Sequence, residues 1–307
     1  MRHTGTGAVK SKIHDTPSRR AFLIIDVIFL TLTTIICIFP IINVLAVSFS
    51  SSWAAAGGFV KLWPVAFTVS AYKYILKTKA FYTAFLVGVE RTLLGVVIQM
   101  ILTILAAYPL SKTKDKFHGR PFYTMYIIIT MLFGGGLIPT YITIAKLHML
   151  DTMWALVLPG AVNTFLIILM MNFIRQLPEE IEESAFLDGA SYWDSLVRII
   201  LPLSMPSIAT CILFSTVGYW NEWFQGLIFM NNPAHYPLQS YLQTVITGLN
   251  AQLMANISLA DVKLMSQINN QTTRASQVFL AAVPIFIVYP FLQRYFMTGL
   301  TLGSVKG

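Results

Sequence analysis

Charged side chains are scarce in this 307-residue chain: Asp, Glu, Lys and Arg make up 11% of it, whereas hydrophobic residues make up 56%. A soluble domain carries about 25% charged residues, so this chain cannot cover itself with a hydrated surface. Its surface must face lipid, where every backbone polar group has to be satisfied within the protein. Together with long apolar runs, the composition predicts an all-α protein that spans a bilayer several times.

Motifs for catalysis and cofactor binding are also missing. The dipeptide Gly-Lys does not occur, which excludes a P-loop for ATP, and there is no Gly-x-Ser-x-Gly elbow. The five histidines lack the spacing of metal ligands. The two cysteines, Cys37 and Cys211, both lie in apolar runs, so we expect free thiols. The net charge of +8 does not indicate a nucleic-acid partner, because the basic residues sit beside apolar runs. We therefore expect no catalytic residue, metal or bound cofactor.

Six apolar segments are long enough to cross a bilayer, which takes about 20 residues in a helix. The predicted spans are Phe22–Ser48, Ala84–Leu110, Phe122–Ala145, Met153–Ile174, Pro206–Met230 and Val278–Thr298. The first segment is too long for a cleaved signal sequence, so we expect it to be a retained span. Three glycines in the third segment, Gly134–Gly136, indicate close helix packing or a local break.

The distribution of Lys and Arg predicts the orientation in the membrane. If the N-terminus is inside, thirteen of the 21 Lys and Arg residues fall on the cytoplasmic side and seven on the outer side. Basic residues are enriched in cytoplasmic loops, and the short segment Lys112–Arg120 contributes four of the thirteen. We expect both termini in the cytoplasm and long outer connections at Phe49–Thr83 and Asn231–Gln277. The sequence does not indicate a function for the connection Asn231–Gln277.

The connection Arg175–Met205 is polar and holds six of the thirteen acidic residues of the chain. Pro178 suits a first helical position, and the acidic residues that follow it favour the positive end of a helix. Asp188-Gly189 is a turn signal, because glycine readily adopts a positive φ. We predict a helix, a turn at Gly189, and a second short helix over Tyr192–Ile200.

The spacing within this connection resembles the EAA loop of permease subunits of bacterial ATP-binding-cassette (ABC) importers. That motif is Glu-Ala-Ala, three residues, Gly, nine residues, and Ile-x-Leu-Pro; the chain departs from it only at the central position, which is serine. Asp188-Gly189-Ala190-Ser191 resembles the carbohydrate branch of the family. The residues expected to couple to an ATPase are Glu183, Ser184, Ala185, Asp188, Gly189, Ala190, Ile199, Leu201 and Pro202.

The resemblance covers most of the chain and implies a type I importer permease. It implies a cytoplasmic tail at residues 1–20 and a transmembrane permease domain at residues 21–307, with the EAA loop at about residues 175–205. The implied partners are a second homologous permease subunit, two ATPase subunits that bind ATP and Mg²⁺, an extracellular sugar-binding protein and the lipid bilayer. The resemblance further implies a bacterial plasma membrane location.

Polar residues in the fifth apolar segment are candidates for the translocation pathway. Trp220, Asn221 and Glu222 combine an aromatic face with hydrogen-bonding groups, which suits a sugar. Polar groups are costly in lipid and should face protein or a wet cavity. The alternative is an aromatic belt at the outer headgroups, with Glu222 among them.

Three functions other than sugar import are possible for a chain of this composition. A permease of the same family for a non-sugar solute fits the same motif. An ion-coupled secondary transporter would lack an ATPase-docking loop. A membrane enzyme, such as an intramembrane protease or a lipid-modifying transferase, would need paired intramembrane Asp residues, a His-rich motif or a nucleophile motif, none of which the sequence carries.

Overall fold

The computed structural model describes residues 17–247 and 270–302, and within them every regular element is a helix. The helices are α1 (Pro17–Ser48), α2 (Ser52–Ala56), α3 (Ser70–Lys77), α4 (Lys79–Ser111), α5 (Arg120–Leu132), α6 (Leu137–Lys146), α7 (Met153–Val157), α8 (Thr164–Ile174), α9 (Glu179–Leu187), α10 (Tyr192–Ser195), α11 (Leu201–Leu203), α12 (Met205–Asn221), α13 (Phe224–Phe229), α14 (Leu238–Thr247) and α16 (Asn270–Leu302). The all-α prediction is confirmed. The expected tail as far as residue 16 and the outer loop at residues 248–269 lie outside the described residues.

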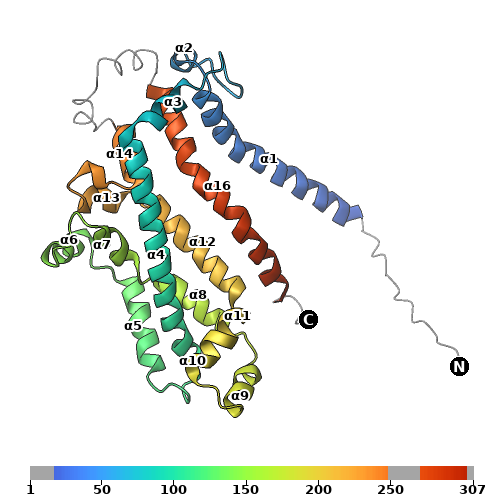
Figure 1. Cartoon of the computed structure of the whole chain (residues 1–307). Helices are drawn as coiled ribbons and strands as arrows, with labels where there is room; N and C mark the ends of the chain where they lie inside the picture. Colours follow the sequence, from blue (N-terminus) through green and yellow to red (C-terminus); the bar gives the residue numbers. More distant parts are fainter. Residues whose placement is uncertain (1–16, 248–269, 303–307) are drawn as a thin grey trace.

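Within the described residues, three continuous helices are long and apolar enough to cross a membrane: α1, α4 and α16. At 1.5 Å per residue, the 33 residues of α4 extend for about 50 Å, which exceeds the roughly 30 Å of a bilayer core. Figure 1 shows α4 running from α3 to the region of α9 and α10; α12 packs against α4, and α16 packs against α12. We call the two ends of the molecule the α9 end and the α2 end.

The other three predicted spans are not continuous helices. The axes of α5 and α6 meet at 111°, and α7, continued by a 3-10 turn to Gly160, meets α8 at 47°. In the fifth segment α12 ends at Asn221, and the separate helix α13 follows it. The predicted spans Phe122–Ala145 and Met153–Ile174 therefore correspond to bent helix pairs that are together long and apolar enough to cross a membrane, and Pro206–Met230 is divided between α12 and α13.

The break between α5 and α6 has a backbone cause. Gly136 has a φ of +82°, a conformation that glycine adopts at little cost and that interrupts a right-handed helix. No side chain or backbone atom lies within 4 Å of where a Cβ would project from Gly134, Gly135 or Gly136. Of the two readings of these glycines, the local break is confirmed.

The main core lies toward the α9 end, where α4 packs against α8 and α12. Its buried members include Met100, Ala107, Leu166, Met170 and Cys211. By contrast, the most apolar stretch of α1 has no buried residue, and Figure 1 shows α1 diverging from the other helices away from its contact with α16. Both cysteines are free thiols, as predicted.

A close approach of α4 and α12 should make Gly95 sensitive to substitution. A Cβ at Gly95 would lie 2.6 Å from ring atoms of Tyr219, whose hydroxyl donates to the Val157 carbonyl at 2.9 Å. Because this ring is buried and anchored, Gly95→Ala should lower the free energy of unfolding by about 1–3 kcal/mol. Thermal unfolding of the full chain in detergent measures this. Gly218→Ala is the matched control, since its Cβ would meet nothing within 4 Å; equal midpoints would contradict the prediction.

Candidate functional site

The connection between α8 and α12 forms the predicted helix, turn and second helix. The first helix is α9, and Pro178 stands one position before it, as its N-cap rather than its first residue. Three of the acidic residues lie in the first turn of α9, where the helix dipole favours negative charge. The second helix begins at α10, continues through a π-helical turn over Leu196–Ile200, and ends in α11.

Two local devices fix the turn between α9 and α10. Gly189 has a φ of +87°, which a β-branched residue would strongly resist. Ser191 and Asp194 form a capping box at the start of α10, in which each side chain bonds the backbone N–H of the other residue. The predicted positive φ at Gly189 is confirmed, and the two helices are held in a defined hairpin.

The tip of this hairpin presents apolar side chains to the outside. Leu187 is 89% exposed, and Tyr192 and Trp193 are exposed beside it. Phe186 contacts Tyr192 edge to face, with ring centroids 4.9 Å apart. Exposed apolar surface of this kind, on a short helix pair, is typical of a segment that fits into a groove on another protein.

The predicted motif residues lie along both helices of the hairpin. Glu183 is exposed, and its carboxylate lies 3.3 Å from the Lys116 ammonium. Ser184 is exposed and donates to the Ile181 carbonyl at 2.9 Å. The other members are Ala185 in α9, Asp188, Gly189 and Ala190 in the turn, Ile199 in the π-helical turn, and Leu201 and Pro202 in α11.

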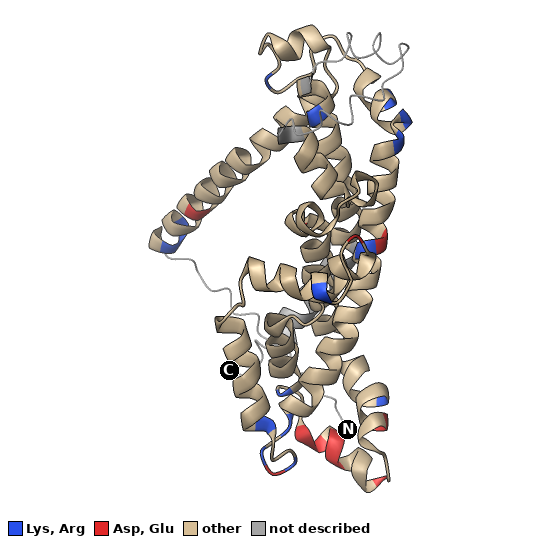
Figure 2. Ribbon diagram, turned by 90° about the vertical axis from the view of Figure 1, so that its left-hand side faces the viewer, with Lys and Arg blue, Asp and Glu red and all other residues tan. Residues whose placement is uncertain are grey.

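The acidic residue that anchors the hairpin is Glu182, which the motif did not identify. Its buried carboxylate pairs with the Lys112 ammonium, at the end of α4. Tyr108 donates to it at 2.6 Å and Ser195 at 2.9 Å. Figure 2 shows acidic α9 beside the basic segment that follows α4. Glu182 thus joins α9 to both α4 and α10.

The pKa of Glu182 reflects these contacts. Burial alone would raise the pKa, but hydrogen bonds from Lys112, Tyr108 and Ser195 outweigh burial and hold it below its ordinary value. The carboxylate is therefore ionised at neutral pH. The signal that could have identified it was the adjacency of Tyr108 and Lys112 at the end of the second apolar segment.

The three pathway candidates lie at the end of α12, and each has a different environment. Trp220 is buried, and its indole N–H donates to the Ala281 carbonyl of α16 at 2.9 Å. Asn221 is the last residue of α12 and is exposed. Glu222 has left the helix, with φ −72° and ψ 113°. Of the three, Asn221 has the exposure that a pathway residue needs, and its role there remains a prediction.

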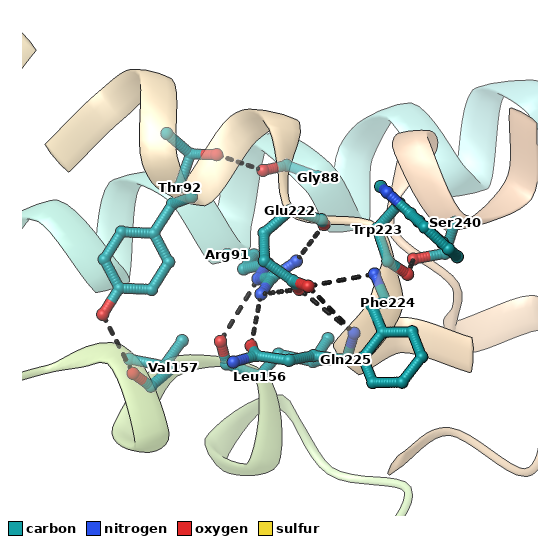
Figure 3. Close-up of polar contacts among 11 residues, drawn as sticks. Gly88, Arg91, Thr92, Leu156, Val157, Glu222, Trp223, Phe224, Gln225 and Ser240 are labelled. Carbon is teal, nitrogen blue, oxygen red and sulfur yellow. Dashed lines mark hydrogen bonds and ion pairs between the residues drawn. The ribbon is translucent and has the colours of Figure 1, made fainter. Parts of the chain in front are cut away.

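Glu222 is held by Arg91 of α4, whose side chain is 1% exposed (Figure 3). The Arg91 Nη2 donates to Glu222 Oε2 at 2.8 Å and to Gln225 Oε1 at 2.6 Å. Its Nη1 donates to the Glu222 carbonyl at 2.7 Å, and its Nε donates to the Leu156 carbonyl at 3.2 Å. The same carboxylate accepts from the backbone N–H groups of Phe224 and Gln225.

Arg91 therefore stabilises the non-helical segment between α12 and α13 and connects it to α7. The sequence places Arg91 and Glu222 in different spans, and no local pattern pairs them. The available signal was that one span carries a cation and another an anion, because charges buried at membrane depth need partners. Among the described residues, no group of three or more His, Cys, Asp or Glu side chains could hold a metal ion.

Residues 115–301 match the family described as binding-protein-dependent transport system inner membrane component. The chain belongs to this family. It is 39% identical over 300 residues to the protein LplC of Bacillus subtilis (strain 168), covering 96% of this chain and 98% of LplC. It is 37% identical over 279 residues to the polygalacturonan/rhamnogalacturonan transport system permease protein YtcP of the same organism, covering 91% and 96%.

Solved structures agree with this assignment. The chain superposes with a TM-score of 0.82 and 31% identity on a chain from the crystal structure of a bacterial ABC transporter involved in the import of the acidic polysaccharide alginate. The match covers 92% of this chain and 98% of that chain. The predicted family and the importer permease fold are confirmed, and the family places the chain in the inner membrane.

Neutralising Glu222 should destabilise this family member. In Glu222→Gln the buried guanidinium of Arg91 keeps its charge but loses its anion. We expect the free energy of unfolding to fall by about 3 kcal/mol. This is near the lower end of the range for breaking a buried ion pair, because the Glu222 side chain is 30% exposed. Thermal unfolding in detergent measures it, and Arg91→Met in the same background should recover part of the loss.

Asn221→Ala is the neighbouring control and should leave the unfolding midpoint unchanged, because Asn221 is exposed. If Asn221 lines the pathway, this variant should also lower solute uptake. A parental midpoint for Glu222→Gln would show that the pair with Arg91 does not hold the break.

Proposed function

We propose that this chain is one transmembrane subunit of an ABC importer and forms half of the translocation pathway for a sugar or oligosaccharide. The observation that carries the proposal is the α9–α10 hairpin, which exposes an apolar tip and contains the EAA spacing. The class of solute is supported by the relatives: YtcP is named for polygalacturonan and rhamnogalacturonan, and the superposed transporter imports alginate. A non-sugar solute is the alternative.

The partners follow from the family to which the chain belongs and from the exposed tip of its hairpin. A second homologous permease subunit would complete the pathway. Two ATPase subunits would bind ATP and Mg²⁺ and hydrolyse the ATP, each receiving one hairpin; this chain has no P-loop of its own. An extracellular binding protein would deliver the sugar. An ion-coupled transporter would have no use for the exposed hairpin.

Movement of the hairpin would reach the spans through two rigid connections. The segment Tyr192–Leu203 meets α12 at 79°, so it acts as a short lever attached to that helix. Glu182 ties α9 to α4 through Lys112 and Tyr108. Closure of the ATPase subunits would therefore displace α4 and α12 together, which is the rigid-body rocking that alternating access requires.

The same proposal places the α9 end and both termini in the cytoplasm. A Cys37→Ala chain leaves only Cys211, which is fully buried, so single cysteines can be added to it. Leu187→Cys should resist a membrane-impermeant thiol reagent in intact cells and react after lysis. Trp63→Cys, 82% exposed near the α2 end, should react in intact cells. The opposite pattern would invert the topology.

The coupling role is tested at Gly189. Gly189→Val should abolish uptake and weaken ATPase association, because valine resists a φ of +87° and the hairpin would change shape. Gly189→Asn is the matched control: asparagine tolerates this conformation, so uptake should be largely retained. The measurements are sugar uptake and the amount of ATPase that co-purifies. Parental uptake by Gly189→Val in a normally assembled complex would exclude the coupling role.

A further inference from the structure

A cavity of about 250 Å³ opens at the α9 end, where α4 and α8 end and α5 and α9 begin. Its lining includes four cationic side chains, Lys112, Lys116, Arg120 and Arg175, and two carboxylates, Glu179 and Glu182. The proposed coupling role uses Glu182 and Lys112 but leaves the cavity itself without a function.

The two lysines of the cavity are already paired. Lys112 pairs with Glu182, while Lys116 lies 3.8 Å from Glu179 and 3.3 Å from Glu183. Neither Arg120 nor Arg175 forms an ion pair with an acidic side chain in the described part of the chain. The excess positive charge of the cavity therefore belongs to these two guanidinium groups.

Arg120 and Arg175 are also close enough to repel one another. Partial desolvation, and then the charge of Arg120, lower the pKa of Arg175. The Arg175 Nη2 donates to the Leu110 carbonyl at 2.9 Å and to the Met171 sulfur at 3.2 Å, which leaves the Nε and Nη1 donors of the guanidinium for a ligand. Arg120 is the first residue of α5, whose N-cap, Gly119, provides no side-chain cap, so the positive end of that helix adds to the field.

An apolar surface leads away from the cavity along α5, which has no buried residue. Phe122, Tyr126 and Ile129 are exposed on it, and Tyr123 stacks on Phe117 near the cavity, with ring centroids 5.8 Å apart. Because α4 and α8 leave the membrane here, the cavity lies at the depth of lipid headgroups. Aromatic side chains are typical of this depth.

We propose that the cavity binds the phosphate of an anionic phospholipid, whose acyl chains lie along the exposed face of α5. A phosphate diester accepts paired hydrogen bonds from guanidinium groups, and basic pockets between spanning helices suit anionic headgroups. A soluble anion would use the two arginines but not the apolar face beside them. The site does not depend on the identity of the transported solute.

In the test, the delipidated full chain in non-ionic detergent is titrated with dioctanoyl phosphatidylglycerol. The midpoint temperature of thermal unfolding is measured at each lipid concentration. The lipid should raise the midpoint of the parental chain. Dioctanoyl phosphatidylcholine, which has the same acyl chains and no net charge, should have little effect. Arg120→Gln should raise the half-saturating concentration of phosphatidylglycerol about fivefold, because one cation contributes that factor near a membrane surface.

Lys114→Gln is the matched control, since Lys114 is exposed in the same connection and does not line the cavity. It should bind the lipid like the parental chain. Arg175→Gln should weaken lipid binding similarly. If loss of the contact with Leu110 destabilises Arg175→Gln, the result for Arg120→Gln still tests the proposal.

Three results would overturn the proposal. One is an unchanged titration in Arg120→Gln. Another is an equal response to inorganic phosphate, which would make the cavity a site for soluble anions. The third is loss of lipid binding whenever an ATPase subunit co-purifies with the chain, which would assign the two arginines to an acidic surface of that subunit.

Discussion

The buried guanidinium of Arg91 is the interaction on which the arrangement of the spanning helices depends. A charge at membrane depth must be matched, and Arg91 reaches the Leu156 carbonyl of α7, the carboxylate and carbonyl of Glu222, and Gln225 of α13. It satisfies a carbonyl that the end of α12 would otherwise leave without a partner. A helix can therefore stop within the membrane-embedded region, because Arg91 bonds the Glu222 carbonyl and the Glu222 carboxylate accepts from the N–H groups of Phe224 and Gln225.

A second charged contact, between Lys112 and Glu182, lies at the C-terminal end of α4. Arg91 and Lys112 are 21 residues apart, or about 32 Å along a helix, which is close to the thickness of a bilayer core. One rigid helix thus connects the hairpin of α9 and α10 with the break after α12. Buried pairs of this kind are weak evidence for net stability. We infer that their main role here is to fix which elements move together.

Sequence reasoning succeeded where the signal was local and failed where it was not. The turn at Gly189 follows from one glycine between two helical patterns, and the structure has it with a positive φ. The glycines at 134–136 left two readings open, because glycine serves both close packing and chain reversal. Glu182 and Glu183 are adjacent and chemically identical. Only packing against Tyr108 and Lys112 buries the first and leaves the second exposed.

The sequence by itself determined the membrane location, the helical class, the approximate position of six apolar segments, and the hairpin with its turn at Gly189. These properties depend on composition, on segment length, and on residue types at fixed spacing along the chain. Tertiary structure alone decided that α12 ends at Asn221, that Trp220 is buried while Asn221 is exposed, and that Arg91 pairs with Glu222. The physical reason is that the buried charge of Arg91 and the break after α12 are stabilised by groups more than 60 residues apart in the chain, whose proximity no local pattern records.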